Sequence, residues 1–487
     1  MNNFYRWLTA LALGAAIAHG IRKKEDVSNC VDGKPLQGKY GTLIAPDLLM
    51  IIFMALFIGV IVTYDIHLLF ESFFSLICGI FISISIYFAI FILLLPLLRK
   101  YVSSKAIALM WLLPNYLYIT VQSFIALNKP LIVLDIGSIS LKIISLVWIS
   151  VALIVFSVYI IRHFIFRFKL LHKAKPVESE SVRNLWKTMQ KQYESEKLFI
   201  KIVTSDNTTT PLSIGLFRRT TVLVLPHINY TEEELKLIFK HELIHIIRTD
   251  SKIKLSIAFC NAICWFNPLM WIAMRKCTED LELSCDEYVI EDCDKDDKEL
   301  YGNLILSTAG NDAGFTTCLS ASAGALKYRL TNIYKPRRRF RGNIMIGALI
   351  AIMILTSGNI ALSYNHQTMK DVFADSFKET SIDRCSISLD EENSMKSYSC
   401  NDPDALNKYI MSLKICEVTG YYNDNDNKDR CLSCHYITDK GGVTVSIEDN
   451  KVECYPLNKS INRNSHTYYL EEPVDWDYIM SMIQNNI

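Results

Sequence analysis

The sequence is poor in charged residues. Asp, Glu, Lys and Arg make up 21% of its 487 residues, against roughly 25% in an average soluble chain, and the formal net charge is only +1. The sequence also lacks internal repeats and low-complexity linkers, which excludes a repeat array. Its length is too great for one ordinary domain, and about three units are expected.

Apolar residues take the place of the missing charge. The hydrophobic fraction is 51%, and these residues are concentrated in blocks that approach or exceed the ~18 apolar residues needed to span a bilayer. The blocks are 48–64, 72–98, 104–127, 139–163 and 342–362. The sequence therefore predicts an integral membrane protein.

Basic residues lie directly beside these blocks, and the positive-inside rule places such flanks in the cytoplasm. They are Arg99, Lys100 and Lys105, then Arg162, Arg167, Lys169, Lys173 and Lys175, then Lys335, Arg337, Arg338, Arg339 and Arg341. A nucleic-acid surface is the alternative explanation, but the flanks abut apolar runs too closely to favour it. Residues 365–487 carry 12 Lys and Arg against 21 Asp and Glu, a net charge of −9, and are expected on the opposite side.

These patterns divide the chain into five parts. We expect an N-terminal segment of unassigned role at 1–46, transmembrane helices at 47–163, a cytoplasmic domain at 164–341, a further span at 342–363 and an extracellular domain at 364–487. Residues 4–20 resemble a signal peptide that ends in Ala16-Ile17-Ala18. Because the number of spans fits better without cleavage, a short first span or a surface helix is the favoured interpretation.

Six of the fourteen cysteines lie in the acidic tail. An even set in a small extracytoplasmic domain predicts a disulfide framework, whose connectivity the sequence leaves open. The six are Cys385, Cys400, Cys416, Cys431, Cys434 and Cys454. Cys431-Leu-Ser-Cys434-His435 also fits the c-type haem attachment pattern, but the surrounding cysteines and the hairpin-like sequence that follows favour disulfides.

Within 164–341, two β-branched runs at 198–203 and 220–225 predict short strands. Thr231 with Glu234 three residues later is a capping box, so a helix is expected from about 232 to about 249. Asn267-Pro268 indicates a second helix start, because a capping residue is followed by proline at the first helical position.

The central motif, His241-Glu242-Leu243-Ile244-His245, lies on the first of these helices. Histidines four residues apart share a helix face, so both rings can bind one metal ion. Zinc activates water for attack on a peptide carbonyl, and Glu242 is the residue expected to take the proton. An amphipathic helix with two solvent-facing histidines is the alternative, and the surrounding motifs disfavour it.

Catalytic zinc usually has three protein ligands, and the second helix supplies the third. Glu282 and Asp286 share a face of this helix. Glu282 is expected to bind the zinc ion, and Asp286 is expected to orient a ligand histidine through its ring N–H. A solvated acidic run is the alternative, since Glu279, Asp280 and Glu287 are close by.

Together these segments resemble the antibiotic sensor-transducer metallopeptidases of Gram-positive bacteria. The resemblance covers about residues 70–363 and rests on Pro211–Arg218, Val222–Pro226, the histidine helix through Arg248 and Asp250, Asn267-Pro268-Leu269, and Glu282–Glu287. It implies a gluzincin-like site with His241, His245 and Glu282 as zinc ligands and Glu242 as general base. It also implies that the strand near 213–224, with Gly215, Leu216 and Phe217, lies along an extended peptide substrate.

Two features depart from this family. Its antibiotic sensors carry an extracellular penicillin-binding domain with a Ser-x-x-Lys nucleophile and a Lys-Thr-Gly strand, and residues 365–487 contain neither. Acylation by β-lactams is therefore not expected. The first 70 residues are the second departure and have no assigned role.

We therefore expect a multi-span α-helical membrane protein with a mainly helical (α+β), zincin-like metallopeptidase domain in the cytoplasm and a small β-rich, disulfide-linked domain outside. The expected function is a zinc-dependent endopeptidase that senses an extracellular ligand and cleaves a cytoplasmic regulator, itself or both. The expected partners are the lipid bilayer, that ligand, a protein substrate such as a transcriptional repressor, and a second copy of the chain, but no nucleic acid directly. Two alternatives stay open: a ligand-binding receptor with a non-catalytic metal site, and a constitutive peptidase that processes membrane proteins.

Overall fold

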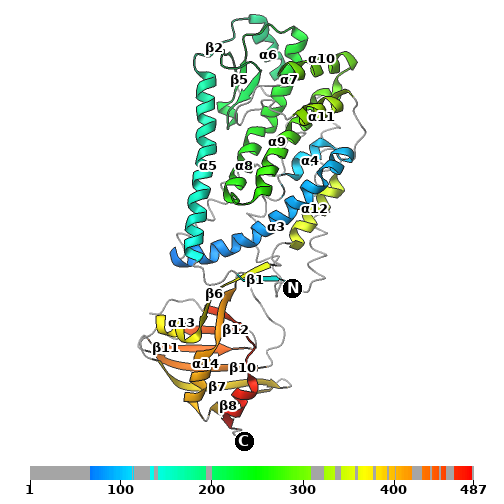
Figure 1. Cartoon of the computed structure of the whole chain (residues 1–487). Coiled ribbons are helices and arrows are strands. Elements are labelled where there is room, and N and C mark those ends of the chain that lie inside the picture. The colour runs from blue at the N-terminus through cyan, green and yellow to red at the C-terminus, as the bar shows by residue number, and fades with distance from the viewer. Residues whose placement is uncertain are drawn as a thin grey trace.

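The described residues form a helical body with a β-rich domain at one end (Figure 1). The computed structural model describes residues 66–111, 113, 132–135, 141–193, 200–308, 323–334, 342–356, 360–376, 380–391, 394–400, 402–418, 430–438, 441–448, 451–456 and 466–484. A small sheet lies at the other end of the body. The predicted N-terminal segment 1–46 and the apolar block 48–64 fall outside the described residues.

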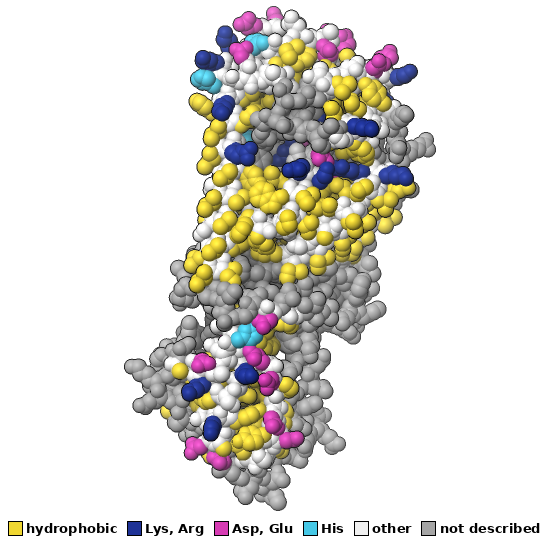
Figure 2. All heavy atoms as spheres, in the orientation of Figure 1, with side chains coloured by type: hydrophobic (Ala, Val, Ile, Leu, Met, Phe, Trp, Pro, Cys, Tyr) yellow, Lys and Arg dark blue, Asp and Glu magenta, His cyan; other side chains and the backbone are white. Residues whose placement is uncertain are grey.

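Two described helices are long and apolar enough to cross a membrane. Helix α3 is Ile66–Tyr101 and helix α5 is Leu141–Leu171, and their apolar stretches are Ile80–Tyr101 and Ile143–Leu171. They coincide with two of the predicted apolar blocks. Figure 2 shows hydrophobic side chains over the lower part of the helical body, with Lys and Arg side chains above them. This distribution agrees with the basic flanks seen in the sequence.

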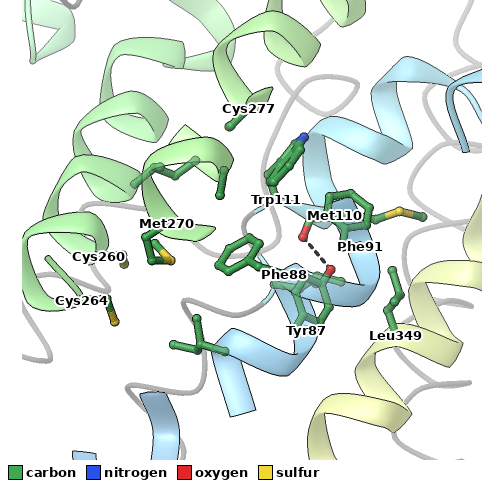
Figure 3. Close-up of a cluster of buried hydrophobic side chains, with 14 of the residues drawn as sticks. Tyr87, Phe88, Phe91, Met110, Trp111, Cys260, Cys264, Met270, Cys277 and Leu349 are labelled. Carbon is green, nitrogen blue, oxygen red and sulfur yellow. Dashed lines mark hydrogen bonds between the residues drawn. The ribbon is translucent and has the colours of Figure 1, made fainter. Parts of the chain in front are cut away.

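Several other helices share an apolar core with α3. They are α4 (Ser104–Met110), α8 (Asp250–Ile263), α9 (Pro268–Val289) and α12 (Asn343–Thr356). In Figure 3, Phe88 and Phe91 of α3 lie against Trp111, with ring centroids 5.9 and 4.6 Å from it, and the Tyr87 hydroxyl donates to the Met110 carbonyl at 2.8 Å. Aromatic side chains bury large areas and pack with defined geometry, so this cluster fixes α3 against α4.

The predicted span at 342–363 differs from the observed helix, whereas most of the predicted block 104–127 lies outside the described residues. Helix α12 ends at Thr356, and strand β6 (Ile360–Thr368) begins inside the predicted block 342–362. The 14 residues of α12 are about 21 Å long at 1.5 Å per residue, less than a ~30 Å hydrocarbon layer. The block 104–127 begins with α4, but residues 114–131 fall outside the described part of the chain. An apolar run by itself does not distinguish a helix from a buried strand, which explains the difference at 342–363.

A four-stranded sheet covers the end of the body that lies farthest from the C-terminal domain, with strand order β2-β3-β5-β4. Its strands are β2 (Lys175–Pro176), β3 (Lys201–Thr204), β4 (Leu212–Ile214) and β5 (Val222–Leu225), and helix α6 (Glu180–Gln192) belongs to the same apolar core. Strands β3 and β5 are the two that the sequence predicts, and they pair in parallel. Strand β4 lies at the edge of the sheet, antiparallel to β5.

Helix α7 (Glu232–Arg248) begins where the sequence predicts. Thr231 Oγ1 accepts a hydrogen bond from Glu234 N at 3.3 Å, and Glu234 Oε2 accepts one from Thr231 N at 2.8 Å, which confirms the capping box. Asn267 likewise caps α9 at Pro268. The same region contains α10 (Lys295–Thr308), α11 (Ala323–Tyr334) and 3-10 turns at Arg218–Thr220 and Ile290–Asp292.

The C-terminal domain is a sheet with short helices packed on it, and its strand order is β1-β6-β9-β13-β12-β11-β10-β7-β8-β14. The strands after β6 are β7 (Thr380–Glu391), β8 (Ser394–Cys400), β9 (Lys414–Val418), β10 (Arg430–Thr438), β11 (Gly441–Ile447), β12 (Lys451–Pro456), β13 (His466–Leu470) and β14 (Ile483–Gln484); the helices are α13 (Met369–Ser376), α14 (Pro403–Ser412) and α15 (Trp476–Ser481). Phe373 and Ile410 of the helices share a core with Leu432 and Val445 of the sheet. The β-rich domain and its β10–β11 hairpin are therefore confirmed.

Strand β1 (Ile132–Asp135) comes from the segment between two predicted spans, yet it belongs to this C-terminal sheet. It pairs in parallel with β6, with Ile132 opposite Ile360. The His366 side chain adds a link, because its Nε2 lies 2.8 Å from Asp135 Oδ1 and its Nδ1 lies 2.5 Å from Glu471 Oε1. A strand of four residues is too short to be predicted from its pattern, and the sequence analysis missed it.

The predicted disulfide framework is not confirmed. Cys416 and Cys454 carry free thiols, and the sheet explains why they cannot pair with each other. Cys416 lies opposite Tyr469 of β13, and Cys454 lies opposite His466 on the other side of the same strand. Because one strand lies between them, the Cα atoms of Cys416 and Cys454 are at least about 9–10 Å apart. This distance exceeds the ~7 Å limit between the Cα atoms of a disulfide.

Disulfides among the other four tail cysteines stay a prediction. Cys434 lies opposite Cys385 on neighbouring strands, while Cys431 is three residues earlier on β10 and therefore faces the other side of the sheet. The side chains of Cys385 and Cys400 fall outside the described residues. Because Cys431 and Cys434 point to opposite faces, one haem group could not bind both.

Candidate metal centre

Helices α7 and α9 bring two histidines and one glutamate together. His241 and His245 are one turn apart on α7, and Glu282 faces them from α9. His241 Nε2 lies 3.1 Å from His245 Nε2, and Glu282 Oε2 lies 3.7 and 3.4 Å from these two nitrogens. The three residues are 7%, 2% and 5% exposed. The sequence thus predicted three residues that do lie in one buried cluster.

The spacing of these three atoms suits a tetrahedral metal ion. Zinc takes nitrogen and oxygen ligands at about 2.0–2.2 Å, so two ligand atoms of a tetrahedral site lie about 3.4 Å apart. Glu282 Oε2 is buried and makes no hydrogen bond; the nearest arginine nitrogen, Arg329 Nη1, lies 3.9 Å away. A buried carboxylate oxygen without a hydrogen bond is costly, and a metal ion between the three ligand atoms would remove this cost.

Burial lowers the pKa of His241 well below its ordinary value, whereas Cys285, Glu282 and Asp250 outweigh burial and raise the pKa of His245. Of the two imidazoles, only His241 is thus held in the neutral form that binds metals while no ion is bound.

The second ring nitrogen of His245 is held by a carboxylate. His245 Nδ1 lies 2.6 Å from Asp250 Oδ2, and Asp250 is fully buried. Arg248 Nε donates to Asp250 Oδ1 at 2.8 Å, and Arg248 Nη2 contacts Oδ2. Arg248 also donates to Ser284 Oγ and to the Leu281 carbonyl on α9, both at 2.9 Å. A carboxylate on Nδ1 fixes the tautomer of the ring and leaves Nε2 to bind a metal.

His241 is held differently from the prediction. Asp286 Oδ1 lies 3.9 Å from His241 Nδ1, too far for the expected hydrogen bond. The Tyr301 hydroxyl of α10 lies between them, 2.8 Å from His241 Nδ1 and 2.7 Å from Asp286 Oδ1, to which it donates. A hydroxyl has one proton. Because this proton goes to Asp286, the Tyr301 oxygen accepts a hydrogen bond from His241 Nδ1–H. Arg329 of α11 holds Asp286 through bonds of 2.6 and 2.7 Å, which draws the carboxylate away from the ring.

Cys285 offers an alternative third ligand. The ligand atoms of His241, His245 and Cys285 all lie within 4.8 Å of one another. The Cys285 sulfur, however, is 3.5 Å from His241 Nδ1, the ring nitrogen that already contacts Tyr301. Burial raises the pKa of the Cys285 thiol, whereas a metal binds the thiolate. Glu282, which faces both Nε2 atoms, is the better third ligand.

Two further charged residues lie at the centre. Glu242 follows His241 on α7 and is 4% exposed. Lys254 of α8 is 6% exposed, and its Nζ lies 3.4 Å from Glu282 Oε1. Burial alone would raise the pKa of Glu282, but His245 and Lys254 outweigh it and hold this pKa well below its ordinary value. Glu282 therefore stays ionised, with Oε1 facing the lysine and Oε2 facing the histidines.

The residues predicted to line the substrate follow β4 rather than lie in it. Strand β4 ends at Ile214, and Gly215 then adopts a φ of 153°. A Cβ at this position would lie 2.6 Å from Thr221 Cα, so only glycine fits. Leu216 and Phe217 form the following bend, and Phe217 is 55% exposed. Their contact with a substrate stays a prediction.

Four residues around the centre were assigned no role from the sequence: Tyr301, Arg329, Lys254 and Asp250. The spacing of Asp250, five residues after His245, was visible in the sequence, but an αL residue, Thr249 with φ 59°, separates the two helices. This turn brings the carboxylate back toward the histidine. Tyr301 and Arg329 lie 60 and 43 residues from their partners His241 and Asp286, and no sequence signal indicates such contacts.

A model of the BlaR1 peptidase M56 family matches residues 81–333, slightly more than half of the chain. The chain belongs to this family. The matched segment runs from α3 to α11 and contains every residue of the metal centre described above. Because peptidases of the M56 family are metallopeptidases, the buried cluster of donors on α7 and α9 is the candidate for their metal site.

Individual members of the M56 family are similar over a shorter segment. The regulatory protein BlaR1 of Bacillus licheniformis is 28% identical over 120 residues, which are 25% of this chain and 20% of that protein. The methicillin resistance mecR1 protein of Staphylococcus aureus is 28% identical over 137 residues, which are 28% of this chain and 23% of that protein. The chain thus aligns with less than a quarter of the length of each relative.

Proposed function

We propose that this member of the M56 family is a zinc-dependent endopeptidase that transduces a signal across a membrane. The observation that carries the catalytic part is the buried triangle of His241 Nε2, His245 Nε2 and Glu282 Oε2, whose carboxylate oxygen has no hydrogen bond. These three side chains would hold the zinc ion. Tyr301 and Asp250 would keep both Nδ1 atoms protonated, so that both Nε2 lone pairs face the ion.

Each residue of the centre then has a definite task. Zinc in such a site polarises a peptide carbonyl and makes water a stronger acid. Glu242 is the proposed general base, which takes a proton from water and passes it to the departing amine. Lys254 keeps Glu282 Oε1 occupied, so that Oε2 stays directed at the histidines. The edge strand β4 and the bend at Gly215, Leu216 and Phe217 are the proposed contact for an extended peptide.

The transducing part of the proposal rests on the arrangement of the domains. The metal centre on α7 and α9 lies away from the C-terminal domain, with α3 and α5 between the two ends (Figure 1). We propose that both helices cross the membrane and that the basic flanks at 99–105 and 162–175 lie in the cytoplasm with the catalytic domain. The acidic C-terminal domain would then lie outside and bind a ligand.

The proposed substrate is a cytoplasmic regulator, such as a transcriptional repressor, or the chain itself. The names of the relatives support a regulatory role, since one is a regulatory protein and the other a methicillin resistance protein. The C-terminal domain lacks the Ser-x-x-Lys and Lys-Thr-Gly motifs of penicillin-binding domains. A ligand other than a covalently bound β-lactam is therefore proposed.

The Glu242→Gln variant tests the catalytic part. We expect metal analysis to show that the purified full-length variant keeps its zinc. Its rate of cleavage of labelled casein and of itself should fall about 10²–10⁴-fold, the usual contribution of a general base. Glu233→Gln, an exposed glutamate on the same helix, is the matched control. Cleavage at the wild-type rate by Glu242→Gln would rule out the proposed chemistry. In cells, an unchanged response of that variant would instead favour a receptor with a non-catalytic metal site.

Removal of 364–487 tests the sensing part. We expect the truncated chain to lose its regulation while its basal cleavage remains. If regulation is unaltered, the protein is a constitutive processing peptidase.

A further inference from the structure

Helix α9 belongs to two apolar cores. Its residues Met270 and Leu281 belong to the core that contains α3, α4 and α12. Its second half contributes Cys285 and Val289 to the core that contains α6 and α7. Glu282 lies where α9 passes from one core to the other, whereas the two histidines lie on α7. A displacement of one core against the other would therefore change the distances between the carboxylate and the imidazoles.

One side chain at the end of α3 contacts α9 close to Glu282, where α9 passes from one core to the other. Arg99, in the last turn of α3, donates from Nε to Asp280 Oδ1 at 2.8 Å and from Nη2 to Glu279 Oε2 at 3.2 Å. Asp280 is fully buried and also accepts a bond of 2.7 Å from Trp111 Nε1. It lies two residues before Glu282, on the opposite side of α9. One side of α9 is thus bound to α3, and the other carries the metal ligand.

Arg99 also reaches the centre by a second route. Its carbonyl accepts a hydrogen bond of 2.6 Å from the Tyr328 hydroxyl of α11, and its guanidinium lies 5.7 Å from the centroid of the same ring. The next residue of α11 is Arg329, which holds Asp286. Arg329 Nη1 also lies 3.9 Å from Glu282 Oε2. Two helices that carry parts of the centre are therefore attached to one residue of α3.

We propose that Arg99 is a positioning residue of the metal centre: it couples the position of α3 to Glu282 through Asp280 on α9 and to Asp286 through Tyr328 and Arg329 on α11. The inference rests on the proposed zinc function and adds how that site is regulated. A movement of α3 along its axis changes the carboxylate ligand's distance from the histidines. The carboxylate of Asp280 makes the coupling strong, because a buried charge that loses its partner is strongly unfavourable and its helix must shift.

The test measures zinc affinity of the purified full chain in lipid nanodiscs, by competition with a chromophoric chelator. We expect Arg99→Gln and Asp280→Asn each to weaken zinc binding about tenfold, the lower end of the effect of residues that support metal ligands. Arg99→Lys, which keeps the charge but not the two-pronged geometry, should recover part of this loss. Lys100→Gln is the matched control, because it removes the same charge from the exposed neighbouring residue.

A double variant separates positioning from general destabilisation. Because Arg99 and Asp280 form one link, the double variant Arg99→Gln/Asp280→Asn should have about the same zinc affinity as the single variant with the lower affinity. Asp280 and Tyr328 belong to separate routes, so the losses of zinc affinity from Asp280→Asn and Tyr328→Phe should add in their double variant. The proposal is overturned if Arg99→Gln and Asp280→Asn have the same zinc affinity as Lys100→Gln. This holds even if thermal unfolding of the metal-free chain shows that the two variants are less stable. If the wild-type chain itself binds no zinc, the proposed function fails, and this outcome is distinct from the first.

Discussion

The hydroxyl of Tyr301 lies 2.8 Å from Nδ1 of His241, so a phenol holds this histidine in place of the carboxylate that the sequence predicted. The same hydroxyl donates to Asp286, which Arg329 fixes in turn. His241 and His245 therefore have unequal support, since a tyrosine contacts the first and an aspartate the second. A neutral acceptor strengthens an imidazole ligand less than a carboxylate does, and the two ligands are expected to respond differently to substitution.

Replacement of Tyr301 by phenylalanine tests its role. The ring would still fill its place in the core, but His241 Nδ1 would lose its acceptor, and we expect zinc affinity to fall about tenfold. Chelator competition and the rate of casein cleavage would measure the change. Tyr193→Phe, at another buried tyrosine of the same core, is the control. An unchanged affinity in Tyr301→Phe would mean that Asp286 or another group orients the ring.

The Asp250→Asn variant should lower both stability and zinc affinity. It leaves the buried guanidinium of Arg248 without its counter-charge, a change that typically costs about 3–5 kcal/mol of unfolding free energy. It also removes the carboxylate from His245 Nδ1. Denaturant unfolding of the metal-free chain measures the first effect. Asp206→Asn, at an exposed carboxylate 3.4 Å from His227, should change the stability by less than about 0.5 kcal/mol.

The capping box of α7 should affect stability without taking part in the chemistry. Thr231→Ala removes the acceptor of Glu234 N, and we expect a loss of about 1 kcal/mol in unfolding free energy. Thr231→Ser keeps a hydroxyl and should retain most of the stability. Neither variant should change the turnover rate of the folded enzyme at saturating substrate. A large fall in that rate for Thr231→Ala alone would place the helix start in the active site.

The link between β1 and the C-terminal sheet should weaken as the pH rises. His366 lies between Glu471 and Asp135 and needs protons on both ring nitrogens to donate to both. The bond to Glu471, followed by that to Asp135, raises the pKa of His366 above its ordinary value. A raised folded-state pKa means that the stabilisation is complete below the unfolded pKa of about 6.5 and is lost as the pH passes the folded value.

Hydrogen exchange of the amides at 132–135, corrected for the intrinsic effect of pH, would measure this loss. We expect protection of β1 to fall with rising pH in the wild type and to depend little on pH in His366→Gln. His435→Gln, at a histidine whose Nδ1 lies 2.8 Å from Thr444 Oγ1 in the same domain, should behave like the wild type. Glu417 accepts a hydrogen bond from Asn365, the residue before His366. Equal pH dependence in His366→Gln would assign the effect to other groups.

Local features of the fold could be predicted because their signals lie within a few residues of one another. The capping box of Thr231 and Glu234 set the start of α7, and Asn267-Pro268 set the start of α9. The four-residue spacing put His241 and His245 on one face, since that spacing is about one helical turn. The apolar block at 139–163 and the hairpin that contains Gly441 were likewise visible from composition and alternation.

Contacts between distant segments depended on packing, which no local pattern encodes. Arg99 and Asp280 are 181 residues apart, and their ion pair exists because the core of α3 and α9 brings two helix surfaces together. The same holds for Tyr301 beside His241 and for β1 beside β6. Helix starts, periodic faces and apolar blocks were therefore encoded locally. The groups that hold the histidines and the attachment of the body to its C-terminal sheet were decided by which surfaces could bury one another.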